Sequence, residues 1–383
     1  MIAIDSLKGS LSSVEAGNAF AAGIKRVSEV RTIVKPMADG GEGTVEALTE
    51  GLGGSLIETK AQDPFHREIT AVYGYIEKEQ KAIIEIAAAA GLTLMEGEKK
   101  DIYRASTYGV GQVIRDAIGR GSRDFLIGIG GSATNDCGIG MLAALGFEFY
   151  DREGKKLGFY GADCGKVERI CLDNRMPELE ECRFRIACDV SNPLLGKNGA
   201  SYIYGPQKGG SPKQVSEMER MHQCFAKKTE EAAGKNYAEY PGAGAAGGLG
   251  FAFLSYLDAV LEPGIHTVMN AVKLEECLKN ADYVITGEGR LDGQSLMGKV
   301  PVGVAQLAKK YDVPVIAVAG GISQDAGKCH DMGIDAFFSI LPGAMKLEEA
   351  MEKNTAVRNI TQAAEEVMRL ILAVEKRKNR STG

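Results

Sequence analysis

The sequence is poor in the residues from which zinc centres and acyl-transfer sites are usually built. It contains four histidines in 383 residues, and none of them lies in a glycine-rich segment. Its eight cysteines are scattered without a C-x-x-C pair. The spacing of a zinc site is therefore absent, and we expect reduced, mostly buried thiols instead of a disulfide framework. A Ser–His–Asp triad would be equally hard to build from these histidines.

Long apolar runs and basic blocks are missing as well. No apolar run reaches the length that a membrane-spanning helix needs. Lysine and arginine number 45 against 51 acidic residues, so the formal net charge is −6. This balance argues against a nucleic-acid partner, because nucleic-acid phosphates require a basic surface. We therefore expect a cytoplasmic protein, either a monomer or a homodimer, with neither membrane nor nucleic-acid partners.

What the chain does have is length and the composition of a globular protein. Its 383 residues are 44% hydrophobic and 25% charged, and a chain this long favours two domains over one core. Apolar runs alternate with helical patterns, which is typical of βαβ units. We predict an α/β protein of two domains. The first has a Rossmann-like or flavodoxin-like parallel sheet built from both chain ends, residues 1–88 and 293–383. The second is an inserted α/β domain with a mixed sheet, residues 89–292.

Local patterns predict several individual elements. Ser12 and Glu15 have the spacing of a capping box, and apolar residues at helical spacing follow them. Strands are predicted over residues 32–37, 69–76, 82–87, 124–129, 183–188 and 283–286. Helices are predicted over residues 109–118, 212–233, 302–310 and 361–376, and a hairpin turn over residues 151–154.

The most informative segment is residues 128–136 (GIGGSATND), which follow an apolar run. A glycine-rich turn between a strand and a helix can present backbone N–H groups to a phosphate. This turn lacks the Gly-Lys-Ser/Thr ending of a Walker A loop. We interpret it as a phosphate cradle for a magnesium nucleotide, with a plain strand–helix junction as the alternative. The predicted contacts are Gly130, Gly131, Ser132, Thr134 and Asn135.

Three further segments combine carboxylates, hydroxyls and glycines after apolar residues. They are residues 5–10 (DSLKGS), 39–44 (DGGEGT) and 287–295 (GEGRLDGQS). Open α/β sheets bind their ligands at the carboxyl ends of the strands. One such segment would be a simple turn, but four indicate a site.

Together with residues 205–209 (GPQKG) and 242–248 (GAGAAGG), these segments resemble the class I glycerate kinases. They occur in the family's order, and the resemblance covers essentially the whole chain. It implies ATP-dependent and magnesium-dependent phosphorylation of D-glycerate in a cleft between two α/β domains. The product that the bacterial class implies is 2-phosphoglycerate, with 3-phosphoglycerate less expected. Cys137 stands where glycine is frequent in the family.

Phosphoryl transfer needs magnesium ligands, a cation on the moving phosphoryl group and a carboxylate near the attacking hydroxyl. We predict Asp189, at the end of an apolar strand, as magnesium ligand or general base, and Asp136 as a second magnesium ligand. Lys8 and Arg290 are the predicted catalytic cations. The residues predicted to bind the substrate are Asp5, Ser6, Asp39, Glu42, Asp292 and Ser295.

Structural interpretations of these residues stay open. Asp189 could form an Asx turn before Pro193, and Arg290 could form a purely structural pair with an aspartate. Asp39 and Glu42 could simply provide negative charge at a helix N-terminus.

Two other functions also stay open, a nicotinamide-dependent oxidoreductase and a non-catalytic sensor of hydroxy acids. The first is disfavoured because no loop combines a G-x-G-x-x-G motif with an acidic residue about 20 positions later in a βαβ unit.

Overall fold

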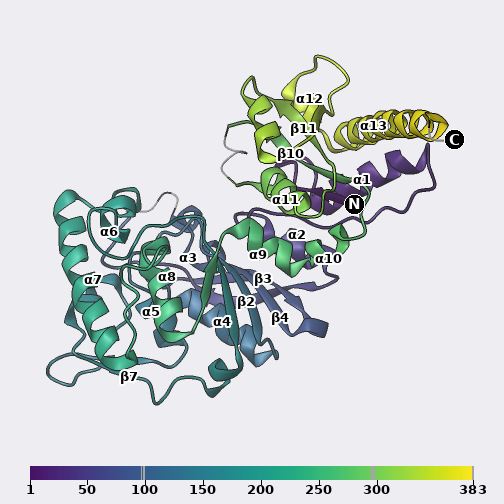
Figure 1. The fold of residues 1–383 in the computed structure, drawn as a ribbon. Helices are drawn as coiled ribbons and strands as arrows, with labels where there is room; N and C mark the ends of the chain where they lie inside the picture. The colour runs from purple at the N-terminus through teal and green to yellow at the C-terminus, as the bar shows by residue number, and fades with distance from the viewer. Residues whose placement is uncertain (96, 98–99, 294, 296–297, 382–383) are drawn as a thin grey trace. The chain divides into compact units, whose positions relative to one another are not determined.

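The computed structural model describes residues 1–95, 97, 100–293, 295 and 298–381 (Figure 1). The chain forms two compact units. Unit 1 contains Met1–Asp39, Glu50–Leu52 and Val268–Gly383, and unit 2 contains Gly40–Thr49 and Gly53–Thr267. The predicted fold class is confirmed, because the chain is α/β with one parallel and one mixed sheet.

Unit 1 is built on a four-stranded parallel sheet in the order β1-β10-β11-β12. Its strands are β1 (Ile2–Ile4), β10 (Val284–Leu291), β11 (Val315–Ile322) and β12 (Ala336–Ser339). The predicted strand over residues 32–37 is wrong. Val34 makes only an isolated parallel bridge to Ile2. Pro36 follows shortly after, and it has no N–H with which to continue the pairing.

The helices of unit 1 begin as the capping signal predicts. Ser12 Oγ accepts a hydrogen bond from Glu15 N, and the Glu15 side chain accepts one from Ser12 N, so the capping box that starts α1 (Ser13–Lys25) is confirmed. The predicted C-terminal helix exists but is longer, as α13 (Lys353–Ser381). The remaining helices of this unit are α10 (Leu274–Leu278), α11 (Val300–Lys309) and α12 (Leu347–Met351).

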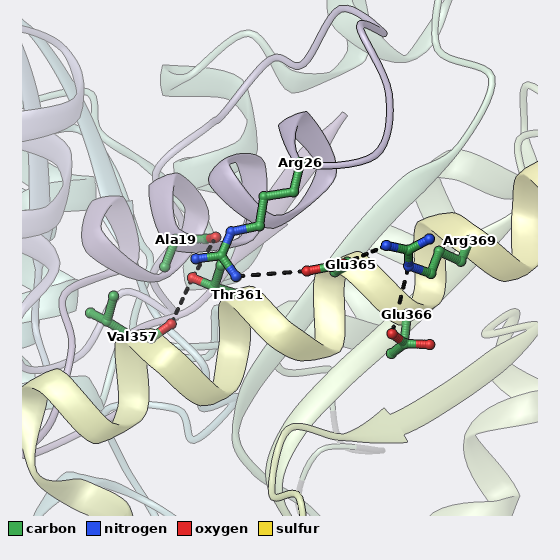
Figure 2. A network of polar contacts seen from close by, with 7 residues as sticks. All are labelled: Ala19, Arg26, Val357, Thr361, Glu365, Glu366 and Arg369. Carbon is green, nitrogen blue, oxygen red and sulfur yellow. Dashed lines mark hydrogen bonds and ion pairs between the residues drawn. The ribbon is translucent and has the colours of Figure 1, made fainter.

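Helices α1 and α13 pack directly against each other, and Figure 2 shows the polar contacts at this junction. Thr361 Oγ1 lies 3.1 Å from Ala19 O. A Cβ atom on Gly23 would lie 2.2 Å from Thr361 O, so only glycine allows the two backbones to come this close. Arg26 and Glu365 add an ion pair at 3.6 Å, but the Arg26 side chain is 61% exposed. Packing of the helices therefore stabilises this junction more than the exposed ion pair does.

Unit 2 is built on a six-stranded mixed sheet in the order β2-β3-β4-β5-β8-β9. The antiparallel pair predicted from residues 69–76 and 82–87 is confirmed, since β3 and β4 pair with Gly74 opposite Ile83. From β4 to β9 the strands run parallel. The strands are β2 (Ser55–Gln62), β3 (Glu68–Ile76), β4 (Lys81–Glu85), β5 (Asp124–Gly128), β8 (Arg183–Ala187) and β9 (Val260–Glu262).

The two units differ in extent from the predicted division of the chain. β4 pairs in parallel with β5, with Ile83 opposite Leu126, and this pairing joins residues 55–85 to the sheet of unit 2. β10 pairs with β1, with Thr286 opposite Ala3, and this pairing joins the residues before 293 to unit 1. Strand pairing therefore groups residues 55–85 with unit 2 and residues 284–291 with unit 1.

The helices of unit 2 follow the predicted pattern closely, and α7 has the predicted bounds. The predicted hairpin turn over residues 151–154 is confirmed, because Asp151 N donates to Lys155 O at 3.0 Å and Leu157 N donates to Phe149 O at 2.8 Å. Tyr150 and Lys156 form an antiparallel bridge across this turn, and β6 (Glu148–Tyr150) also pairs with β7 (Arg169–Cys171). The helices are α3 (Ala87–Ala90), α4 (Tyr108–Gly119), α5 (Ile139–Ala144), α6 (Ala200–Tyr204), α7 (Pro212–Ala233) and α8 (Ala245–Tyr256), and residues of both units form α2 (Thr44–Gly51) and α9 (Gly264–Ala271).

Residues 287–291, predicted as the start of a loop, continue β10 instead. Glu288 pairs with Ala319 and Arg290 pairs with Gly321 of β11. Here the pairing of β10 with β11 outweighs the preference of the glycines for turns and loops. Gln294, which the predicted segment also included, lies outside the described residues. Within the described part of the chain, no helix has both the length and the apolar character needed to cross a membrane.

Candidate active site

Unit 1 contains a cavity of about 580 Å³ at the carboxyl ends of β1, β10 and β11. Acidic and basic side chains from residues 5–10 and 287–295 line it, together with Asp39 from the segment 39–44. Parallel strands thus bring residues that are far apart in the sequence to one edge of the sheet. The polar lining residues are Asp5, Ser6, Lys8, Ser10, Asp39, Glu288, Arg290, Asp292 and Lys299.

Two carboxylates of this cavity are buried close to other negative charge. Asp5 is 7% exposed, and its Oδ1 accepts a hydrogen bond of 2.7 Å from Ser6 N. Burial, reinforced by the neighbouring Asp39 carboxylate, raises the pKa of Asp5 to about 7. Burial also raises the pKa of Glu288, whose Oε1 has no hydrogen-bond partner among the residues described. Such a cluster favours a bound cation or proton.

Three cationic side chains line the same cavity. Lys8 is exposed at the end of β1, and the Arg290 side chain is 71% exposed, with its Nε 3.7 Å from Asp292 Oδ2. Lys299 directly precedes α11, and the first N–H groups of a helix have no acceptor within the helix itself. From the sequence, Lys299 is a candidate for a phosphate contact or for a hinge position. A cation next to a helix N-terminus favours a bound anion such as phosphate.

The other residues that line this cavity include many apolar side chains. Most of them come from the end of β11, the residues after β12 and the short helix α12. An apolar wall beside charged groups is typical of a pocket that holds a ligand with both a ring system and charges. The apolar lining residues are Leu7, Ile322, Ile340, Leu341, Met345, Leu347, Ala350, Met351 and Ala356.

Unit 2 contains a smaller cavity of about 210 Å³ beside the glycine-rich turn. Gly130, Gly131 and Ser132 of the predicted cradle line it, and so does Asp189 at the end of β8. Gly131 has φ of 69°, which glycine adopts without strain. The other lining residues are Gly40, Gly41, Leu92, Ile129, Ala187, Cys188, Val190, Tyr204, Gln207, Lys208, Ala245 and Ala246.

Asp189 is exposed at this cavity, and its Oδ1 accepts a hydrogen bond of 2.8 Å from Gly264 N. Gly264 is the first residue of α9, so the carboxylate also satisfies one backbone N–H at that helix end. Through this contact, one of the two oxygens of the Asp189 carboxylate caps the N-terminus of α9. The contact leaves the chemical role of Asp189 as a prediction.

The second half of the predicted cradle faces the protein interior. Thr134, Asn135 and Asp136 are each 0% exposed. Asn135 Nδ2 donates to Ser201 Oγ at 3.2 Å. The Asp136 carboxylate accepts hydrogen bonds from Thr107 and from the backbone N–H groups of two glycines at the start of α5. This geometry does not support Asp136 as a magnesium ligand, because its oxygens are already bound to internal donors. Thr134 and Asn135 likewise support the turn from inside.

Two other predicted substrate residues, Ser295 and Glu42, occupy different surroundings. Ser295 is fully buried, and its Oγ accepts a hydrogen bond of 3.0 Å from Asp292 N, so it closes the turn after β10. Glu42 is exposed in unit 2, whereas Asp39 belongs to unit 1. Ser295 and Glu42 are absent from the described lining of both cavities.

Comparisons with known proteins identify the family of the chain. The model of the glycerate kinase family matches residues 1–372. The chain belongs to the glycerate kinase family. It is 42% identical to "Glycerate kinase" of Halalkalibacterium halodurans, covering 96% of both chains, and 42% identical to "Glycerate 2-kinase" of Escherichia coli, again covering 96% of both. A crystal structure of a "putative glycerate kinase 2" from Salmonella typhimurium LT2 superimposes with a TM-score of 0.90 at 38% identity, covering 98% of each chain.

Membership of the glycerate kinase family makes the chain a kinase and confirms the resemblance seen in the sequence. The alternatives, an oxidoreductase and a non-catalytic sensor, are not favoured. In the part of the chain that the structure describes, no group of three or more histidine, cysteine, aspartate or glutamate side chains is arranged to hold a metal ion.

Sequence reasoning on this glycerate kinase missed Lys208. It lines the small cavity although it is 2% exposed, and its Nζ donates to Ser132 Oγ at 2.8 Å and Thr134 O at 2.6 Å. Burial lowers the pKa of Lys208 to about 7. The available signal was the segment GPQKG at residues 205–209, which carried the family resemblance but received no chemical role.

Proposed function

We propose that this kinase transfers the γ-phosphoryl group of ATP to the C2 hydroxyl of D-glycerate, giving ADP and 2-phosphoglycerate. The observation that carries this proposal is the cavity of unit 1, where buried carboxylates, three cations and an apolar wall surround one space. The product is supported by the name "Glycerate 2-kinase" of the Escherichia coli relative, which is 42% identical to this chain.

The cavity of unit 1 fits a nucleotide better than it fits a three-carbon acid. Its volume of about 580 Å³ lies within the range of roughly 300–1,000 Å³ for pockets of larger ligands. Ile340 and Leu347 on its apolar side would contact the base, and Lys8 and Arg290 would contact the phosphates. This reverses the roles expected from the sequence, in which the segment around Gly130 held the nucleotide and residues 5–10 held the acid.

The residues around this cavity also fit magnesium. The donors are carboxylate oxygens, which magnesium prefers, and Glu288 offers a buried Oε1 without a described partner. Asp5 has a raised pKa of about 7, so a divalent cation would relieve its repulsion with Asp39. Magnesium usually takes only one or two protein carboxylates and completes its shell with phosphate oxygens and water. When bound, it would neutralise charge on the phosphates, and one or two of the carboxylates of Asp5, Asp39 and Glu288 would hold it.

Asp189 is the residue proposed to act on the acceptor. The C2 oxygen of D-glycerate attacks the γ-phosphorus, and the bond from that phosphorus to the β–γ bridging oxygen breaks, so that ADP leaves. The hydroxyl proton passes to the Asp189 carboxylate, which lines the small cavity of unit 2. Lys8 and Arg290 stabilise the charge on the transferred phosphoryl group.

Phosphorus NMR with ATP, magnesium and D-glycerate tests the reaction and the position of the new phosphate together. The expected result is a new resonance that matches authentic 2-phosphoglycerate, with an equal amount of ADP. L-glycerate serves as the matched control and should react much more slowly. A resonance that matches 3-phosphoglycerate would overturn the assigned position, and the absence of ADP formation with D-glycerate would overturn the function.

A further inference from the structure

Lys208 is a buried cation with unused hydrogen-bonding capacity. An ammonium group has three N–H donors, and two of them bind Ser132 Oγ and Thr134 O. Among the described residues, Lys208 forms no ion pair with a carboxylate, although it is 2% exposed. An unpaired buried charge is costly, so the position favours a ligand that brings a negative charge. The cavity that Lys208 lines is the place where such a ligand would bind.

The backbone next to Lys208 also offers donors to an anion. The N–H groups of Gly130, Gly131 and Ser132 have no hydrogen-bond acceptor among the residues that the structure describes. Gly131 has φ of 69°, and a left-handed residue in such a turn makes successive N–H groups converge on one side. These three residues line the same small cavity as Lys208. A side-chain cation and a set of free backbone donors therefore border one space.

The size of the cavity selects the ligand. Water occupies roughly 30 Å³ per molecule in the liquid, so about 210 Å³ has room for a small acid of a few heavy atoms. A nucleotide needs a pocket from the larger range of roughly 300–1,000 Å³. The cavity of unit 1, at about 580 Å³, has that volume, whereas the small cavity does not.

We propose that the small cavity of unit 2 is the subsite for the carboxylate of the hydroxy acid, held by Lys208 and by the N–H groups of residues 130–132. This inference rests on the proposed function, and it assigns the acceptor substrate of that reaction, the hydroxy acid, to the small cavity of unit 2. Asp189 borders the same cavity, so an acid anchored by its carboxylate presents its hydroxyl toward a carboxylate of the protein. Tyr204 forms part of the wall, with its ring centroid 5.9 Å from Lys208 Nζ and its hydroxyl donating to Asn192 Oδ1 at 2.6 Å.

The electrostatics of Lys208 are consistent with this role. Burial lowers its pKa to about 7, and the nearby Asp136 carboxylate opposes that shift only in part. A bound carboxylate supplies the missing partner and raises the pKa of Lys208, so binding of the acid takes up protons near pH 7. His222, which hydrogen-bonds Asn135 O at 3.0 Å, stays neutral there because burial lowers its pKa to about 4.

A phosphate of the nucleotide is the other anion that these groups would recognise. Steady-state kinetics distinguishes the carboxylate of D-glycerate from a phosphate of ATP as the anion bound in this cavity. The variants are Lys208→Met and Lys208→Gln, the second of which keeps hydrogen-bond donors at the turn. The matched control is Lys100→Met, because Lys100 is an exposed lysine whose Nζ donates to Gln207 O of the same segment at 3.1 Å. Thermal melting establishes that each variant is folded before its KM values are measured.

The expected result is a KM for D-glycerate raised about 30- to 100-fold in both Lys208 variants, which is the scale of a lost hydrogen bond to a charged group. The KM for ATP should change less than about 3-fold, and Lys100→Met should match the native protein in both constants. Calorimetry should show D-glycerate binding to the native protein without nucleotide, and proton uptake near neutral pH that is lost in Lys208→Gln.

A raised KM for ATP with an unchanged KM for D-glycerate would overturn the assignment and identify the cavity as a phosphate site. Unchanged KM values for both substrates in folded Lys208 variants would overturn it as well. Failure of the proposed function has a different signature, since the native protein itself would then form no ADP with D-glycerate. If D-glycerate also fails to bind that native protein, the assignment falls with the function.

Discussion

Thr107 and Asp136 are joined by two hydrogen bonds to a single carboxylate oxygen. Thr107 N lies 2.7 Å and Thr107 Oγ1 lies 2.8 Å from Asp136 Oδ2. The same Thr107 hydroxyl accepts a hydrogen bond from Met141 N at 2.9 Å. Asp136 thus links the residue before α4 with the first turns of α5, and it does so from a fully buried position. Its chemistry is that of an internal support for the glycine-rich turn.

Asp136→Asn should therefore lower stability and leave magnesium affinity unchanged. The amide NH₂ of asparagine cannot accept the hydrogen bonds that one carboxylate oxygen now accepts, so buried donors lose their partner. The expected loss is about 2–4 kcal/mol of unfolding free energy, measured by urea titration. Asp173→Asn, at an exposed aspartate of the same unit, is the control and should change stability by less than about 0.5 kcal/mol. A stable variant with tenfold weaker magnesium dependence would restore Asp136 as a metal ligand.

Gly247→Ala tests the close contact between the turn at residues 242–248 and the glycine-rich turn. A Cβ atom on Gly247 would lie 2.1 Å from Thr134 O, and Gly247 has φ of 69°. We expect a loss of about 3 kcal/mol or more, from overpacking against backbone and from left-handed strain. Gly119→Ala is the matched control, because a Cβ atom on Gly119, at the end of α4, would meet no atom within 4 Å. Equal urea midpoints for the two variants would contradict this account.

Much of the fold could be predicted because its signals are local. The capping box at Ser12 marks the start of α1, and the segment predicted as a long polar helix over residues 212–233 forms α7 with those bounds. β10 shows the limit of such signals, since pairing with β11 extends it through glycines that look like a loop. Cys137 adopts φ of 49°, a left-handed conformation that glycine adopts most readily. The resemblance to the family, in which glycine is frequent at this position, therefore pointed to an unusual backbone conformation here.

The site itself was predictable only as a set of segments. The sequence indicates that residues 128–136 form a turn, but it does not tell which side chains face a cavity and which face the core. Ser132 lines the cavity, whereas Asp136 points inward. Lys208 contacts Ser132 across 76 positions of the chain, and its burial depends on that tertiary contact. Directions of side chains and long-range contacts are set by packing, which local patterns do not encode.

Asp189→Asn should lower kcat without unfolding the protein. The asparagine Oδ1 can still accept the hydrogen bond from Gly264 N, so the cap of α9 and the melting temperature should be preserved. Loss of the carboxylate base should reduce kcat by about 10²-fold, with smaller changes in both KM values. Rates from initial-velocity kinetics, compared with the melting curve, separate the two roles. An unaltered kcat would leave Asp189 as a helix cap alone.

The last prediction concerns Asp5 and the pH dependence of stability. Its folded-state pKa of about 7 lies above the ordinary value of 3.8, because the carboxyl is buried and faces Asp39 and Glu288, while Lys8 acts in the opposite direction. The folded protein therefore binds more protons than the unfolded chain between about pH 4 and pH 7. The contribution of Asp5 to stability is present below that window and is lost as the pH rises through it.

Asp5→Asn removes this titration and keeps an acceptor for Ser6 N. The variant should be about 1–3 kcal/mol more stable than the native protein at about pH 8, with a smaller difference at about pH 5. Asp331→Asn, at an exposed aspartate of the same unit, should show no such pH-dependent gain. Urea titrations at the two pH values measure the effect. Because Asp5 is also proposed to hold magnesium, the stabilised variant should require a higher magnesium concentration for half-maximal activity. A gain in stability that is equal at both pH values would show that repulsion among these carboxylates is not its source.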